Sequence, residues 1–320
     1  NDHRLGANEA PPAIISVFLG EQLEDVLEQL ISTGEATHSL KGGKLQTGVD
    51  TLPDLAKDAT DRNRTSPFAF TGNRFEFRMV ASSNTIGDVN TVLNAMMAEQ
   101  FEKAVEVLSK ADDFETAVTE YTAKLMREHQ RIIFNGNGYG EEWIEEAKRR
   151  GLSNLRSTVD ALPVFVSKES VDLFTKNGVY TESEMMARYD ILLENYYKTL
   201  NIEALTMISM VKNDIMGAAC SYQRSLAETI SAKKAALTSI SCETEEAMLV
   251  KASDLTSGLA AGLKKLEEDV DKESVYEDVY DLAKYNRDVI FEDMGKLREV
   301  VDELETRVPK EIWPYPTYGE

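Results

Sequence analysis

The spacing of hydrophobic positions divides the chain into a mixed first third and a helical remainder. One early segment has apolar residues at helical spacing, at Leu23, Val26, Leu27 and Leu30. Short strands are predicted in PPAIISVFLG, DRNRTSPFAF and NRFEFRMV, because these runs are rich in β-branched and aromatic residues. Thr71 and Gly72 separate the last two runs and are typical of a tight turn.

From about residue 100 onward, the pattern predicts helix almost without interruption. Helices are expected over 114–134, 141–150, 167–176, 182–198 and 201–269. Near the end, apolar residues recur at steps of four and three, at Leu255, Leu259, Leu263, Leu266 and Val270. A second stripe follows the polar segment DKES, which predicts a long antiparallel helical hairpin over about 226–308. The expected fold class is α+β, with a small mixed portion followed by a large all-helical region.

The strand predicted in NRFEFRMV has charged residues on one face only. Successive side chains of a strand point to opposite sides, so Arg74, Glu76 and Arg78 share one face. Phe75, Phe77 and Met79 share the other. This alternation is typical of a solvated sheet face, and is also compatible with the polar floor of a site for a multiply charged ligand.

The composition excludes some classes of partner. The chain has 35 Lys and Arg against 56 Asp and Glu, a formal net charge of -21. Such a chain repels nucleic acid and anionic membranes on average, so neither is expected as a partner. No apolar run approaches the roughly 20 residues that span a bilayer. Cys220 and Cys242 lie far from any CxxC motif and are expected to be free, buried or half-buried thiols in a reducing cytosol.

Further charged groups lie near the polar strand in the sequence. Arg4 and Glu9 occupy a segment rich in Gly and Pro, typical of a loop that contacts a ligand or of a surface ion pair. Arg62 and Arg64 are two residues apart, so they could bind phosphate oxygens together or pair with nearby aspartates. Glu76 could be a ligand of a hard cation such as Mg²⁺. Arginines and a metal together suit phosphoryl transfer.

A glycine-rich motif later in the chain, FNGNGYGEEW, does not fit a phosphate-binding loop. Lys followed by Ser or Thr is missing after it. We therefore expect a turn that ends a helix.

Several segments resemble the C-terminal half of type III glutamine synthetases, the long bacterial class of that family. They are RLGANEAPP, RNRTSPFAFTGNRFEFRMVASS, RIIFNGNGYGEEW, LENYYKTLNIEAL and WPYPTYG. The resemblance covers essentially the whole chain. It implies ATP-dependent ligation of ammonia to L-glutamate through a γ-glutamyl phosphate, with Mg²⁺ or Mn²⁺ at the site. It also implies a cytoplasmic enzyme that assembles into a ring-shaped homo-oligomer.

The resemblance also implies roles for individual residues. Glu9 resembles the catalytic flap glutamate that closes the site and helps to deprotonate ammonium, and Arg4 a glutamate-binding arginine. Arg64 is similar to an arginine that contacts ATP phosphates. Glu76 resembles a metal ligand, and Arg78 an arginine that binds the substrate.

Two departures from the better-known classes concern the arginines. Arg4 lies five residues before Glu9, whereas those classes usually have six. A second phosphate-binding arginine is replaced here by Ala69. Arg62 or Arg74 is a candidate to take its place.

The family implies a division of the chain at about residue 105. Residues 1–105 would be the C-terminal part of the catalytic domain, and 106–320 the helical region of the type III class. Further site residues would precede residue 1, so the chain is expected to be a piece of a longer protein and inactive alone. Two alternatives remain, a helical assembly module and a pseudo-enzyme that keeps the fold without turnover.

Overall fold

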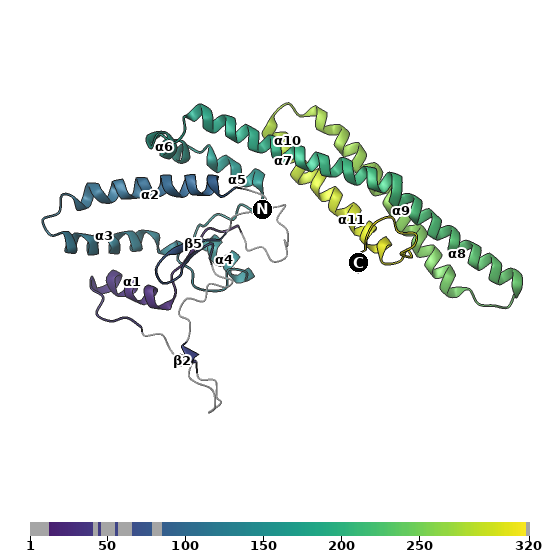
Figure 1. Ribbon diagram of the computed structural model, residues 1–320, viewed down its shortest axis with the longest axis horizontal. Coiled ribbons are helices and arrows are strands. Elements are labelled where there is room, and N and C mark those ends of the chain that lie inside the picture. The colour runs from purple at the N-terminus through teal and green to yellow at the C-terminus, as the bar shows by residue number, and fades with distance from the viewer. Residues whose placement is uncertain (1–12, 41–43, 46–54, 57–65, 79–84, 318–320) are drawn as a thin grey trace. The chain divides into compact units, whose positions relative to one another are not determined.

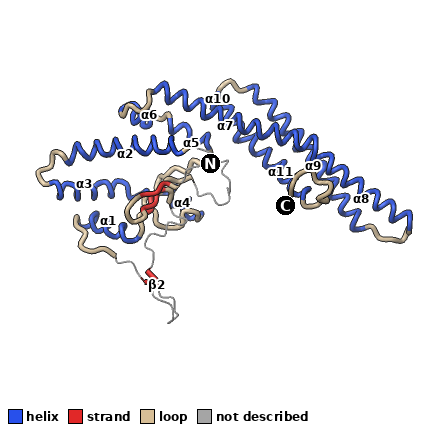
Figure 2. Tube along the Cα trace, in the orientation of Figure 1, coloured by secondary structure: helices blue, strands red, loops and turns tan. Residues whose placement is uncertain are grey.

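The computed structural model describes residues 13–40, 44–45, 55–56, 66–78 and 85–317. The chain forms two compact units, Asn1–Met185 and Met186–Glu320. Most of the described chain is helical, and its strands belong to the first unit (Figure 2). None of the helices in the described ranges is both long enough and apolar enough to cross a membrane.

Short strands and helices make up the first unit (Figure 1). Its strands are β1 (Val17–Phe18), β2 (Lys44–Leu45), β3 (Leu55–Ala56), β4 (Phe68–Phe70) and β5 (Phe75–Phe77). Its helical segments are α1 (Glu21–Thr33), α2 (Ile86–Leu108), α3 (Phe114–His129), the 3-10 turn η2 (Gln130–Ile132), α4 (Glu141–Arg149), α5 (Thr158–Phe165) and α6 (Lys168–Lys176). Helix α7 (Glu182–Met210) begins in this unit and continues into the second.

A small sheet has the strand order β1–β4–β5. Strand β1 is parallel to β4, with Val17 opposite Phe68. Strand β4 is antiparallel to β5, with Ala69 opposite Glu76. The crossover from β1 to β4 contains α1 and a second, antiparallel sheet of β2 and β3. A parallel pair requires such a long connection, because a tight turn can only reverse the chain.

The predicted tight turn joins β4 to β5. Gly72 has a φ of 92°, a left-handed conformation that glycine adopts without the strain a Cβ would bring. The backbone N–H of Thr71 donates to the carbonyl of Arg74 at 2.8 Å. The turn sets β5 antiparallel to β4, so the prediction of two short strands here is confirmed.

Two apolar clusters hold the helices of the first unit together. Ile14, Trp143 and Ala147 form one of them, with the Phe134 ring stacked on Trp143 at a centroid distance of 3.7 Å. The other joins α2, α6 and the start of α7 through Ala95, Phe174 and Met185. Helix α3 lies between α1 and α2 and contacts both (Figure 1).

Several helices begin where the sequence provides a capping side chain. Thr85, Asp113, Ser157 and Ser167 each accept a hydrogen bond from a backbone N–H in the first turn of α2, α3, α5 and α6. These bonds satisfy donors that a helix leaves unpaired at its start. The starts of these helices are therefore local properties of the sequence.

Long helices with two π-helical interruptions form the second unit. They are the rest of α7, the π-helix η3 (Val211–Ile215), α8 (Met216–Ala236), α9 (Glu243–Asp271), the 3-10 turn η4 (Lys272–Val275), α10 (Val279–Tyr285), the π-helix η5 (Asn286–Ile290) and α11 (Phe291–Glu305). Helix α9 packs against both α8 and α11 (Figure 1).

The predicted apolar stripe forms the buried face of α9. Leu255, Leu259, Leu263 and Leu266 are all buried. Gly262 lies against α11, and a Cβ added there would be 3.1 Å from Cδ1 of Leu297. The small residue thus permits close approach of the two helices, which run antiparallel.

The prediction of helix almost without interruption over 201–269 is wrong at 237–242. Helix α8 ends at Ala236, Leu237 has an extended backbone, and α9 starts at Glu243. The chain turns back here, and an ion pair between Lys233 and Glu245 joins the two helices. The range 226–308 expected for a hairpin therefore begins within α8 and contains this further turn.

One further expectation concerns the division of the chain into domains. The division expected at residue 105 falls inside α2, whereas the compact units divide after Met185. The family-based division stays a prediction.

Cys220 and Cys242 are both free, as predicted. Cys242 is buried, but Cys220 is exposed because its neighbours Ala219 and Tyr222 form the buried face of α8.

A network of charges lies where α9 meets α11. Nζ of Lys265 contacts Oδ2 of Asp269 at 2.7 Å and also contacts Asp293. Lys272 contacts the other oxygen of Asp269 at 2.6 Å. Burial by itself would raise the pKa of Asp269, but the hydrogen bonds from the two lysines outweigh it and hold that pKa below its usual range.

A second polar cluster joins α7 to η4 and η5. Nδ2 of Asn201 donates to Oε2 of Glu273 at 2.5 Å. Oε1 of Glu273 and Oδ1 of Asn286 are buried and have no hydrogen-bond partner among the described residues. Burial raises the pKa of Glu273, while Asn201 and Asn286 act in the opposite direction. The folded state therefore holds a proton at Glu273 to a higher pH than the unfolded state does.

We predict that Glu273→Gln stabilises the second unit by about 1 kcal/mol at neutral pH, because a neutral amide removes a buried charge. Above the unfolded-state pKa of about 4.3, wild-type stability should fall as pH rises through the raised folded-state pKa, because the folded state binds more protons in that window. The difference in the free energy of unfolding between variant and wild type should therefore grow as pH rises across this window. Urea unfolding followed by helical circular dichroism over a pH series measures it.

Glu277→Gln serves as the control, because Glu277 is exposed and only a few residues away. It should leave stability unchanged. An equal effect of the two substitutions would contradict a special environment at Glu273.

Candidate functional site

The polar face of β5 is the part of the predicted site that the structure describes. Arg74, Glu76 and Arg78 alternate with Phe75 and Phe77 along this strand. The two phenylalanines pack on the rings of β4, with centroid distances of 5.3 Å for Phe75 and 4.8 Å for Phe77. Aromatic packing on one side therefore directs the charged side chains to the other.

An ion pair joins two of these charged residues. Nη2 of Arg74 donates to Oε1 of Glu76 at 3.2 Å. The Arg74 side chain is 70% exposed and that of Glu76 is 25% exposed. Such an exposed pair adds little to stability, of the order of 0–1 kcal/mol. The pair matters more for chemistry than for stability, because it places the Arg74 guanidinium beside a carboxylate that a ligand can reach.

Ala69 lies opposite Glu76 on the neighbouring strand and is fully buried. Because directly opposed residues share a face of the sheet, a long side chain at position 69 would lie beside Glu76. Arg74 also lies beside Glu76, but it comes from the same strand, two residues earlier. The structure thus supplies a guanidinium next to Glu76 although position 69 has none.

Glu76 suits a hard divalent cation as one ligand. Mg²⁺ is usually bound by one or two carboxylates together with phosphate oxygens and water. Within the ranges that the structure describes, His, Cys, Asp and Glu side chains form no group of three that could hold a metal. A cation at Glu76 would therefore need its other ligands from outside those ranges, from a nucleotide or from water.

Four residues of the predicted site lie outside the described residues. They are Arg4, Glu9, Arg62 and Arg64. The structure therefore brings together Arg74, Glu76 and Arg78 on one strand, and their relation to the other four stays a prediction. Among the three described residues, Arg78 extends the strand pairing, since its backbone N–H donates to the carbonyl of Pro67 at 2.8 Å.

Buried hydroxyl groups anchor the strands that carry this face. Oγ of Ser16 donates to Oγ of Ser66 at 2.7 Å, and Ser66 donates to the carbonyl of Phe134 at 3.0 Å. The N–H of Phe134 donates in turn to the carbonyl of Val17 at 2.9 Å. Three segments far apart in the sequence are thereby joined next to β4.

The NGNGYG motif has a structural role that the sequence analysis missed. Oδ1 of Asn135 accepts hydrogen bonds from the backbone N–H groups of Leu19 and Gly20, at 2.9 and 3.1 Å. Its Nδ2 donates to Glu24 of α1. The motif follows η2 and leads into α4, so it joins two helical segments and also binds the start of α1. An Asn directly before a glycine-rich turn was the sequence feature that could have indicated this role.

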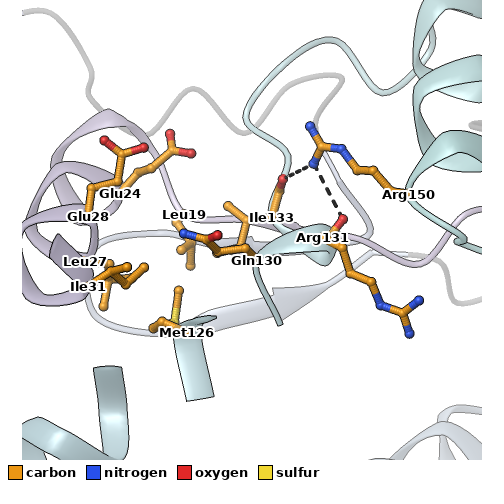
Figure 3. A pocket seen from close by; sticks show the side chains of 10 residues that line it. All are labelled: Leu19, Glu24, Leu27, Glu28, Ile31, Met126, Gln130, Arg131, Ile133 and Arg150. Carbon is orange, nitrogen blue, oxygen red and sulfur yellow. Dashed lines mark hydrogen bonds between the residues drawn. The ribbon is translucent and has the colours of Figure 1, made fainter. Parts of the chain in front are cut away.

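A cavity of about 390 Å³ opens between α1, η2 and the end of α4 (Figure 3). Its apolar lining is Leu19, Leu27, Ile31, Met126 and Ile133. Glu24 and Glu28 line it from α1, and Arg150 from the opposite side (Figure 3). The Arg150 guanidinium donates to the carbonyl of Ile133 at 2.8 Å and to Oε1 of Glu146 at 2.5 Å. The hydrogen bond from Arg150 lowers the pKa of Glu146, so the two side chains form an ion pair beside the cavity.

The chain is similar to known proteins of one family. The sequence profile described as the glutamine synthetase C-terminal domain matches residues 117–234. All of the chain aligns with a glutamine synthetase of Butyrivibrio fibrisolvens at 40% identity, covering 46% of that protein. It aligns equally completely with a type-3 glutamine synthetase of Dictyostelium discoideum at 34% identity and with a glutamine synthetase of Bacteroides fragilis at 32%. The chain covers 44% and 45% of these two, so it spans about half the length of the curated relatives it matches.

We predict that Asn135→Ala locally destabilises the junction of β1 and α1 by about 2 kcal/mol, because two backbone N–H groups and Glu24 lose their partner. Amide exchange at Leu19 and Gly20 should speed up about thirtyfold. Hydrogen-exchange mass spectrometry of peptides that contain these residues measures the change.

Asn137→Ala is the matched control, because Asn137 lies in the same loop and its side chain accepts a hydrogen bond from the backbone N–H of Tyr139. It should leave exchange at Leu19 and Gly20 unaltered. Loss of protection in both variants would mean that the loop as a whole, and not Asn135, secures this junction.

Proposed function

Because the chain belongs to the glutamine synthetase family, we propose that the protein it is part of is a glutamate–ammonia ligase. Such a ligase forms L-glutamine from L-glutamate and ammonia at the expense of ATP, through γ-glutamyl phosphate, and assimilates nitrogen. The observation that carries this proposal is similarity to three glutamine synthetases over the whole chain, at 32–40% identity. One of these relatives is named type-3, and we assign the chain to the same class.

On this proposal, Glu76 binds the divalent cation and Arg78 binds the carboxylate of L-glutamate. The alternation along β5 supports it, because it directs the two side chains to one face two residues apart. The exposure of Glu76 supports it too, since a metal ligand must be reached by ATP. The cation, Mg²⁺ or Mn²⁺, would neutralise phosphate charge when bound.

Arg64, Arg62 and Arg74 are proposed to bind ATP phosphates. A guanidinium offers a planar fork of donors that matches phosphate oxygens and keeps its charge at any physiological pH. For Arg74, the hydrogen bond to Glu76 supports the assignment, because phosphate and cation must lie together during phosphoryl transfer. Arg74 would thus take the place of the arginine that other classes have where this chain has Ala69.

Arg4 and Glu9 are proposed to complete the glutamate side of the site. Glu9 would close over the site and take a proton from ammonium, and Arg4 would hold the substrate carboxylate. Both roles rest on the family resemblance and on the residue types, since an arginine binds carboxylate and a glutamate can act as a general base.

For the whole protein, we propose a cytoplasmic homo-oligomeric ring in which neighbouring subunits complete each site. Residues 1–105 would then be the end of the catalytic domain and 106–320 the helical region of the type III class. Within that region, the antiparallel helices α8, α9 and α11 would serve assembly as well as folding.

We predict that Glu76→Ala and Arg64→Ala in the full-length protein each lower γ-glutamyl transferase activity about a hundredfold or more, because each removes charge stabilisation at the phosphates. Glu76→Ala should also weaken the dependence on Mn²⁺ and Mg²⁺ concentration. Activity assays under both cations measure these effects, and size-exclusion chromatography checks that the oligomer is intact.

Glu120→Ala is the matched control, since Glu120 is an exposed residue of α3. It should keep full activity. If Glu76→Ala and Arg64→Ala also kept full activity in an intact oligomer, the β5 face would be a solvated sheet face, and the roles assigned to it would fall.

A separate prediction concerns the 320-residue chain by itself. It should form no glutamine above background, because it spans about half the length of its relatives and its described residues form no group of three side chains that could hold a metal. A coupled assay of ADP release with L-glutamate and ammonia measures this. Turnover well above background would show that the chain contains a complete site.

A further inference from the structure

The second unit contains a cavity of about 440 Å³ whose lining includes none of the residues assigned a role above. Its walls come from α7, η3, α11 and the segment 313–316. Small-molecule sites typically have volumes of about 300–1,000 Å³, so this cavity is large enough for a ligand.

Most of the lining is apolar. Met207 and Met210 come from α7, Val301 from α11, and Trp313 from the segment that follows α11. Trp313 is buried, whereas Ile202, on the α7 wall, is 64% exposed. An apolar molecule in the cavity would cover such surface and be held by contacts with methionines, which adapt readily to ligand shape.

The cavity is built on an irregular piece of helix. Val211 and Ile215, at the ends of the π-helix η3, are buried and line it. π-Helical turns are rare and occur frequently at functional sites. The hydroxyl of Tyr315 donates to Oδ2 of Asp214 in the same π-helix at 2.6 Å. That hydrogen bond, with burial, raises the pKa of Tyr315 to about 12, so the bond persists at any physiological pH and holds the segment 313–316 as a wall.

The charges around the cavity are predominantly negative. Glu203, Asp302 and Glu305 line it together with one cation, Arg298. Nε of Arg298 lies 3.4 Å from Oδ2 of Asp302. Glu305 is half-buried, and no described residue forms an ion pair or a hydrogen bond with its carboxylate. A half-buried carboxylate for which the described residues supply no counter-charge, next to an apolar cavity, favours a ligand that brings a positive charge.

We propose that this cavity binds a small organic cation, an ammonium group carried on an aromatic or branched apolar body. The body lies among Met207, Met210, Val301 and Trp313, and the ammonium group faces Glu305. Anions with the same apolar body are excluded, because the lining carries three carboxylates and one guanidinium.

Isothermal titration of the full-length protein with tryptamine and with indole-3-propionate tests this proposal. The two probes share an indole ring and carry opposite charges at neutral pH. Tryptamine should bind at least about tenfold more tightly, because only it can pair with Glu305. Absence of tryptamine binding up to about 10 mM, or equal binding of both probes, overturns the proposal.

Two variants and a control locate the site. Glu305→Gln should weaken tryptamine binding about tenfold and leave indole-3-propionate binding unchanged or stronger. Met207→Trp should fill the cavity and abolish binding of tryptamine. Glu299→Gln makes the same charge change at an exposed position of α11 and should bind tryptamine as wild type does. Undiminished tryptamine binding in both Glu305→Gln and Met207→Trp would place the ligand elsewhere and refute the assignment.

Discussion

A buried chain of hydrogen bonds next to the small sheet determines where the polar strand face lies. Ser16 and Ser66 are almost wholly inaccessible to solvent; the Ser16 hydroxyl donates to that of Ser66, which donates to the carbonyl of Phe134. In a buried position, a hydroxyl without a partner would cost about 1–3 kcal/mol, so the three segments must meet in this register. Because β5 is tied to β4 by a tight turn, the same bonds also set which way Glu76 faces.

On the polar face of β5, a weak ion pair is held in a defined orientation. The Arg74–Glu76 pair is too exposed to contribute much to stability. Packing of Phe75 and Phe77 against β4 sets the orientation, and the charged side chains follow from strand alternation. On the proposed function, this arrangement would keep a carboxylate for the metal and a guanidinium for phosphate side by side on one strand.

The helical unit depends on the opposite kind of interaction, a large apolar interface with few buried charges. The leucine stripe of α9 is covered by its neighbours, and the polar groups concentrate where helices meet or distort. Asp269 and Asp293 share Lys265 at one such place, and the half-buried Glu273 lies near the π-helix η5 at another. The other π-helix, η3, lines the second cavity. Each of the two π-helices therefore lies next to a cluster of polar groups or next to a cavity.

The sequence by itself determined the features that depend on neighbouring residues. Capping side chains placed the starts of α2, α3, α5 and α6, the apolar stripe predicted the buried face of α9, and alternation sorted Arg74, Glu76 and Arg78 from the phenylalanines. The resemblance of whole segments identified the family. Only the tertiary structure showed that Asn135 binds the start of α1, that Ala69 lies opposite Glu76, and that α8 ends at Ala236. The pairing of Ala69 with Glu76 and the end of α8 depend on where the chain turns back. The contact of Asn135 depends on residues far apart in the chain, since 116 positions separate it from Leu19, and no local spacing encodes it.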